Sequence, residues 1–144
     1  MASLVFPNGF VKYPEDLVSH HDGVTQLYQK EQIRYNDIAY QKMIDLSFEY
    51  ENKQYAVVYP KSTGDIQSEG RLLSHCVGSY VQSVIQGNTR ILFMRSKENL
   101  TTPLVTIEVR DGKIAQARGK YNRNLTYDEK NFLEEYAKKK KLRY

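Results

Sequence analysis

The sequence predicts an α+β fold: helices at the N-terminal end, a small antiparallel sheet of at least three strands in the C-terminal half, and a closing helix. Apolar residues recur at helical spacing in the first third, and alternating apolar segments follow between residues 90 and 120. A T-x-x-E capping box at Thr126 and Glu129 then opens the last helix. With 144 residues, 40% of them hydrophobic, the chain is long enough for one core, so we expect a single domain over residues 1–144.

Helical spacing in the first third runs through two stretches, which predict two helices. The first opens at Pro14, a residue suited to the first turn of a helix, and the second ends near Leu46. The positions that define the two stripes are Leu17, His21, Val24 and Tyr28, then Ile33, Tyr40 and Ile44.

Shorter elements are expected between residues 48 and 88. Residues 48–50 and 55–59 alternate around the polar stretch ENKQ, which predicts a hairpin that ends at Pro60. A short helix with Ile66 and Leu73 on its apolar side comes next. Another follows from about Cys76 and stops at Gly87 and Asn88, which favour a helix C-terminus.

Three strands are predicted at 90–95, 103–110 and 113–120, paired in that order, with helices packed on one face. The first carries apolar residues on both faces, so it should be an interior strand. Asp111 and Gly112 join the last two strands and are typical of a two-residue hairpin turn.

This turn predicts which residues of the hairpin face each other. A regular register places Gln116 and Arg118 on the apolar side of the sheet, where each needs hydrogen-bond partners or a cleft. Two interpretations remain open: a functional cleft, or an edge arginine that reaches water beside a glutamine bonded to backbone. The predicted pairs are Val109 with Ile114, Ile107 with Gln116, and Val105 with Arg118.

His75 and Cys76 precede the helix that ends at Gly87 and form the second candidate site. A thiol at a helix N-terminus lies at the positive end of the helix dipole, which favours the thiolate and makes Cys76 a candidate nucleophile. A lone cysteine is also a common buried core residue. His75 is a candidate acid or base, or a cap of the helix that follows.

Charge and cysteine usage limit the class of protein. Residues 110–144 carry 11 of the 21 Lys and Arg but only five of the 17 Asp and Glu. The excess of positive residues behind the net charge of +4 therefore lies at the C-terminal end. Such a basic end favours contact with phosphates, although cations also stabilise a solvated helix C-terminus. A single cysteine excludes an internal disulfide, and we expect no metal site, no cofactor, no membrane segment and a cytoplasmic location.

Several blocks in fixed order resemble the C-terminal domain of PcfJ-like proteins, which are found on conjugative plasmids and in phages. The resemblance covers most of the chain and is strongest over residues 66–136. It includes a lead-in with Pro14, Leu17, His21 and Asp22. The blocks match at His75, Cys76, Val77, Gly78 and Tyr80; Gly87, Ile91, Phe93 and Arg95; Thr106, Glu108 and Val109; and Gln116, Arg118, Gly119, Lys120 and Asn122.

The resemblance implies an accessory role in DNA transfer or processing by mobile elements, with conjugation or phage proteins as partners. We expect a module that binds nucleic acid, DNA rather than RNA, through a basic C-terminal region. The residues expected to contact phosphates are Arg118, Lys120, Arg123, Lys138, Lys139, Lys140 and Lys141.

Two alternatives stay open. One is a small enzyme or ligand-binding domain in which Gln116, Arg118 and Asn122 bind an anionic group and His75 and Cys76 supply the chemistry. The other is a protein-interaction domain without a catalytic site.

Overall fold

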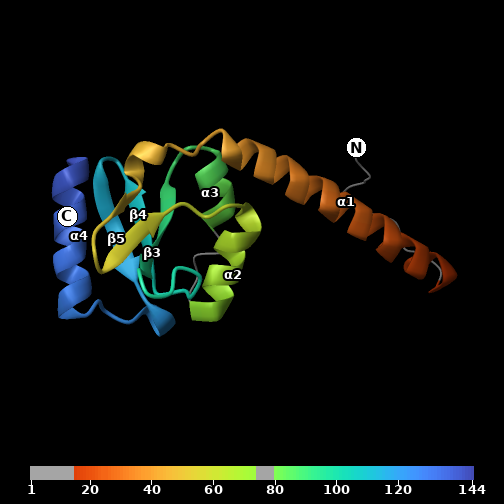
Figure 1. The fold of residues 1–144 in the computed structure, drawn as a ribbon. Helices are drawn as coiled ribbons and strands as arrows, with labels where there is room; N and C mark the ends of the chain where they lie inside the picture. The colour runs from red at the N-terminus through yellow and green to blue at the C-terminus, as the bar shows by residue number, and fades with distance from the viewer. Residues whose placement is uncertain (1–14, 74–79) are drawn as a thin grey trace. The chain divides into compact units, whose positions relative to one another are not determined.

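The computed structural model describes residues 15–73 and 80–144, with side chains from Leu27 onward in the first helix. It divides into two compact units, Met1–Arg34 and Tyr35–Tyr144. The described residues of the first unit are helical from Glu15. The second, called the sheet unit below, contains a five-stranded antiparallel sheet and helices (Figure 1).

Helix α1 spans Glu15–Gln41 as one helix, so the prediction of two helices here is wrong. The physical reason is that no glycine or proline interrupts the chain between Val24 and Gln41. Within the sheet unit, the end of α1 is fixed by hydrogen bonds to the segment before α2 (Thr63–Leu73). The hydroxyl of the buried Tyr40 donates to the carbonyl of Pro60 at 2.7 Å.

The sheet has the strand order β1-β2-β3-β4-β5, so β3 is the central strand, as its apolar character on both faces predicts. The predicted first hairpin and the last three strands are confirmed, with small shifts at their ends. The strands are β1 Tyr50–Glu51, β2 Tyr55–Val58, β3 Arg90–Ser96, β4 Val105–Arg110 and β5 Lys113–Arg118. Asp111 and Gly112 have φ values of 54° and 73°, as the predicted two-residue turn requires.

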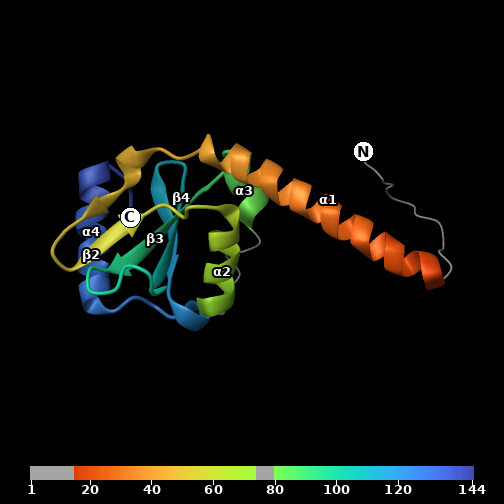
Figure 2. The same ribbon diagram turned by 45° about the vertical axis from the view of Figure 1, so that its right-hand side comes forward.

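Helices cover both faces of the sheet, which corrects the prediction that they pack on one face (Figure 2). Helix α4 (Tyr127–Lys140) lies on one face, where Phe132 contacts the ring of Tyr55 with 5.3 Å between centroids. Helices α2 and α3 (Val81–Ile85) lie on the other. Both faces need cover because neighbouring residues of β3, such as Leu92 and Phe93, are both apolar and point to opposite sides.

Two short 3-10 helices complete the unit. The segment η2 (Leu46–Phe48) is capped by the Asp45 carboxylate, and the Phe48 carbonyl accepts from the buried Tyr136 hydroxyl at 2.6 Å. The segment η4 (Lys120–Asn122) follows β5 and contacts α2. Of the helix predicted from about Cys76, α3 is the described part, because residues 74–79 lie outside the described residues.

The predicted capping box of α4 is present. The Thr126 hydroxyl accepts from the Glu129 amide at 3.2 Å, and the Glu129 carboxylate accepts from the Thr126 amide at 2.8 Å. Arg123 forms a bidentate ion pair with the same carboxylate, at 2.9 and 3.0 Å. Burial opposes ionisation of Glu129, but the hydrogen bonds from Arg123 and Thr126 prevail and hold its pKa below the ordinary value.

Candidate functional site

A β-bulge in the β4–β5 hairpin decides which way the candidate residues point. Val109 pairs with Ile114 as predicted, but the register then shifts, and Glu108 lies opposite Gln116. Ala115 is left without an opposite residue, which is the arrangement of a β-bulge. The predicted pairs Ile107 with Gln116 and Val105 with Arg118 are therefore wrong.

Because of this shift, Gln116 and Arg118 lie on the face of the sheet opposite to the predicted one. Ala117 pairs with Ile107 and is buried, while Arg118 pairs with Thr106. One extra residue reverses the faces of all residues that follow it, since side chains alternate along a strand.

Most strand residues of the PcfJ-like motif blocks share this second face, which α2 and α3 cover. Paired residues of neighbouring strands point to the same side, and residues two apart along one strand do as well. Phe93 pairs with Thr106, Thr106 with Arg118, and Glu108 with Gln116, so these side chains lie on one side of the sheet. The members are Ile91, Phe93, Arg95, Thr106, Glu108, Gln116 and Arg118.

The centre of this face holds a buried ion pair between Arg95 of β3 and Glu69 of α2. The guanidinium donates to both carboxylate oxygens, at 2.6 and 2.9 Å, and the two side chains are 6% and 2% exposed. The Thr106 hydroxyl also donates to Glu69, at 3.3 Å. Burial raises the pKa of Glu69, although the hydrogen bonds and charge of Arg95 oppose that shift. This pair ties α2 to the sheet.

Glu69 did not emerge as a candidate from the sequence, although a signal was present. It stands on the apolar side of α2, three residues after Ile66 and four before Leu73, where a carboxylate needs a partner.

A second polar contact lies on the same face of the sheet, where the buried Thr89 hydroxyl donates to Glu108 at 2.7 Å. Among described residues, no buried side-chain nitrogen or oxygen lacks a hydrogen-bond partner.

Gln116 and Arg118 also line a pocket along the outer edge of β5, called the edge pocket below. It has a volume of about 340 Å³. The loop before α4, the first turn of α4 and the C-terminal tail form its other walls. Its lining residues are Ile114, Ala115, Gln116, Ala117, Arg118, Asn124, Leu125, Lys130 and Tyr144.

Arg118 brings a positive charge into this pocket, and among the described residues it forms no ion pair with an Asp or Glu side chain. Its half-buried guanidinium donates to the Ala117 carbonyl at 3.2 Å, which leaves further N–H donors of the fork. Arg95 and Arg123, by contrast, form bidentate pairs with glutamates. Lys130, an exposed side chain, lines the same pocket and adds a second cation.

The sequence did not predict Asn124, Lys130 and Tyr144 as site residues. They reach the pocket from the loop before α4, from α4 itself and from the tail. The tail is held against β5 because the Ile114 amide donates to the Arg143 carbonyl at 2.8 Å. No local pattern marks such contacts, since they depend on how α4 and the tail return to β5.

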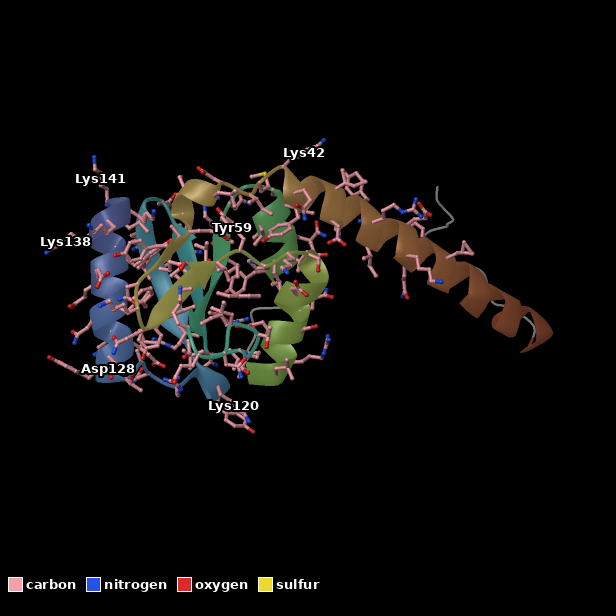
Figure 3. The ribbon with its side chains drawn as sticks, in the orientation of Figure 1. Lys42, Tyr59, Lys120, Asp128, Lys138 and Lys141 are labelled. Carbon is pink, nitrogen blue, oxygen red and sulfur yellow. The ribbon has the colours of Figure 1, made fainter. Side chains whose placement is uncertain are left out.

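The other predicted phosphate-binding residues do not form one patch with Arg118. Figure 3 shows Lys138 and Lys141 extending outward from the end of α4, whereas Lys120 lies at the opposite end of the sheet unit. Lys140 lies over the ring of Tyr50, at 5.6 Å from its centroid. Lys139 is exposed.

The remaining candidates occupy different surroundings. Asn122 is exposed in η4, outside the residues that line the edge pocket. Arg123 is engaged by Glu129 and by the Asn124 carbonyl. His75 and Cys76 lie outside the described residues, so their predicted roles stay predictions.

No group of three or more His, Cys, Asp or Glu side chains is placed to hold a metal ion in the described part of the chain. Among the described helices, none has the length and apolar character required to span a bilayer.

Comparisons with known proteins agree with the motif blocks. The family model of PcfJ-like protein matches residues 4–133. A Listeria innocua protein with the name uncharacterized protein Lin1253/Lin1744 is 38% identical over 122 residues, which cover 80% of this chain and 26% of the relative. The chain thus spans about a quarter of the length of that relative. No solved structure matches. Since the family model covers most of the chain, the chain belongs to the PcfJ-like protein family.

Proposed function

We propose that this chain is a nucleic-acid-binding accessory module for DNA transfer or processing by plasmids or phages. The observation that carries the proposal is the half-buried Arg118 without a carboxylate partner among described residues, in a pocket that it shares with Lys130. A guanidinium binds phosphate strongly because its planar fork matches two phosphate oxygens.

A second group of basic residues lies at the end of α4, outside the residues that line the edge pocket. Lys138, Lys139 and Lys141 are exposed, and Lys113 at the start of β5 pairs with Arg143 of the tail. Contacts of this kind release counterions from the phosphate backbone, so they supply affinity without sequence preference. The module therefore binds strands by charge, with DNA as the expected partner.

The enzyme or ligand-binding alternative keeps one supporting observation. Gln116 and Arg118 do line a common pocket, as that hypothesis requires. Its proposed acid or base, His75, lies outside the described residues, and Asn122 does not line the pocket. Phosphate binding uses only residues that the structure describes, and we therefore favour it.

A salt titration tests the proposal. Fluorescence anisotropy with single-stranded and double-stranded DNA and RNA should show binding at about 50 mM salt that weakens linearly on a log-log plot as salt rises. Replacing Lys138, Lys139 and Lys141 with alanine should reduce the slope by about 2 to 3, because each lost phosphate contact contributes about 0.7–0.9.

The matched control replaces three exposed lysines that neither line the edge pocket nor belong to α4, namely Lys42, Lys53 and Lys61. Net charge falls equally in both triple variants, so a general charge effect would change both slopes alike. Absence of binding at low salt for every nucleic acid would contradict the proposed function.

A further inference from the structure

The edge pocket combines chemical features that a simple phosphate site does not need. Arg118 and Lys130 supply positive charge, and Gln116 and Asn124 supply amides that both donate and accept hydrogen bonds. Apolar side chains and the ring of Tyr144 line the rest. Such a mixed lining fits a ligand with an anionic part and a flat, partly apolar part that carries polar edges.

The volume of the pocket limits the size of that ligand. At about 340 Å³ the pocket is near the lower end of the range of about 300–1,000 Å³ for small-molecule sites. One compact group fits, such as a single nucleotide unit.

The bulge at Ala115 argues against an added β-strand as the occupant. A strand that pairs with β5 needs a regular row of outward amides and carbonyls, and a bulge interrupts that row. The tail pairs with β5 only before the bulge, where the Ile114 amide donates to Arg143 and the Arg143 amide donates to Gly112. The edge pocket lies alongside and beyond this interruption, so a peptide strand does not fit the geometry.

Tyr144 is available as a stacking surface. It lines the pocket and is 56% exposed. Burial and the nearby charge of Glu134 raise the pKa of its hydroxyl, while Arg118 opposes the shift. The side chain therefore stays neutral at physiological pH, and its ring can stack on a base. Arg118 lies close enough for its charge to affect the pKa of the Tyr144 hydroxyl.

We infer that the edge pocket holds one nucleotide of a single strand, with its phosphate on Arg118 and Lys130 and its base against Tyr144. This inference rests on the proposed function and adds a substrate class, namely single-stranded nucleic acid. A duplex keeps its bases stacked inside, so it can use the basic end of α4 but not the Tyr144 surface.

The test measures anisotropy with a labelled oligothymidylate and with a duplex of equal length. Tyr144→Leu keeps an apolar side chain but removes the ring, so single-strand affinity should fall about 5-fold or more while duplex affinity stays unchanged. Arg118→Ala should lower single-strand affinity about 10-fold or more. Arg71→Ala is the matched control, because Arg71 is an exposed arginine of α2 that bonds only Ser68 in the described residues.

Competition separates a strand from a free nucleotide, which offers the same chemistry. Thymidine 5′-monophosphate should compete at far higher concentration than oligothymidylate, and inorganic phosphate at higher concentration still. Equal affinity for the mononucleotide and the oligonucleotide overturns the strand assignment.

The outcomes distinguish the two proposals. Unchanged single-strand binding by Tyr144→Leu, or an equal loss for duplex, overturns the nucleotide pocket and leaves the proposed function standing. Failure of the unaltered protein to bind any strand at low salt overturns the proposed function as well. If thermal melting shows that Arg118→Ala does not fold, the exposed Tyr144 still provides the deciding variant.

Discussion

Replacing Arg95 with methionine should lower the free energy of unfolding by about 3–5 kcal/mol. The substitution keeps much of the side-chain volume but leaves the Glu69 carboxylate, 2% exposed, without the guanidinium that now donates to both of its oxygens. It also removes the contact of the Arg95 guanidinium with the ring of Phe93, at 4.4 Å from the centroid. Urea unfolding monitored by circular dichroism measures the change from the shift in midpoint at constant slope.

The double variant Arg95→Met with Glu69→Leu is the matched comparison. A buried pair replaced by apolar groups of similar volume often costs little, because both desolvation penalties disappear together. The double variant should therefore recover most of the stability that Arg95→Met loses. A double variant as unstable as the single one would show that the pair does not hold α2 to the sheet in this way.

Introducing a carboxylate at Ala117 should cost about 3 kcal/mol or more. Ala117 is 5% exposed and pairs with Ile107, so Ala117→Asp places an unpaired charge among apolar residues. Gln116→Asp is the control at the adjacent exposed position and should stay within about 0.5 kcal/mol. Thermal and urea unfolding of both variants compare the two faces of β5 directly.

The same pair of variants tests the bulge. A regular hairpin would reverse the two faces, so that Gln116→Asp would be the damaging change and Ala117→Asp the harmless one. That reversed ranking would contradict the observed register.

Much of the sheet could be predicted because its signals are local. Asp111 and Gly112 mark the turn, because they are residues that readily adopt the positive φ that its two positions require. The apolar residues on both faces of β3 correctly indicated that β3 is the central strand. The capping box at Thr126 is also a local signal, and it correctly predicted the start of α4. The bulge carries no such signal, since Ala115 suits a regular strand as well as a bulge. The predicted register was therefore wrong by one residue beyond Ala115, and Gln116 and Arg118 were assigned to the wrong face.

The candidate site was predictable in part. Gln116 and Arg118 stood out as polar residues in a strand, and the structure does place both in one pocket. Their surroundings differ from the prediction, because they lie at the sheet edge beside Asn124, Lys130 and Tyr144. Partners that come from a loop, a helix and the tail are brought together only by the tertiary fold, which no local pattern encodes.

The most direct test of the central claim, that nucleic acid binds along the edge of β5, is solution NMR of the protein with a single-stranded DNA oligonucleotide. Amide resonances should shift in β5, in residues 124–130 and at the end of α4, while those of β2, which lies on the far side of the central strand β3, stay in place. Shifts concentrated in β2, with β5 unchanged, would contradict the account.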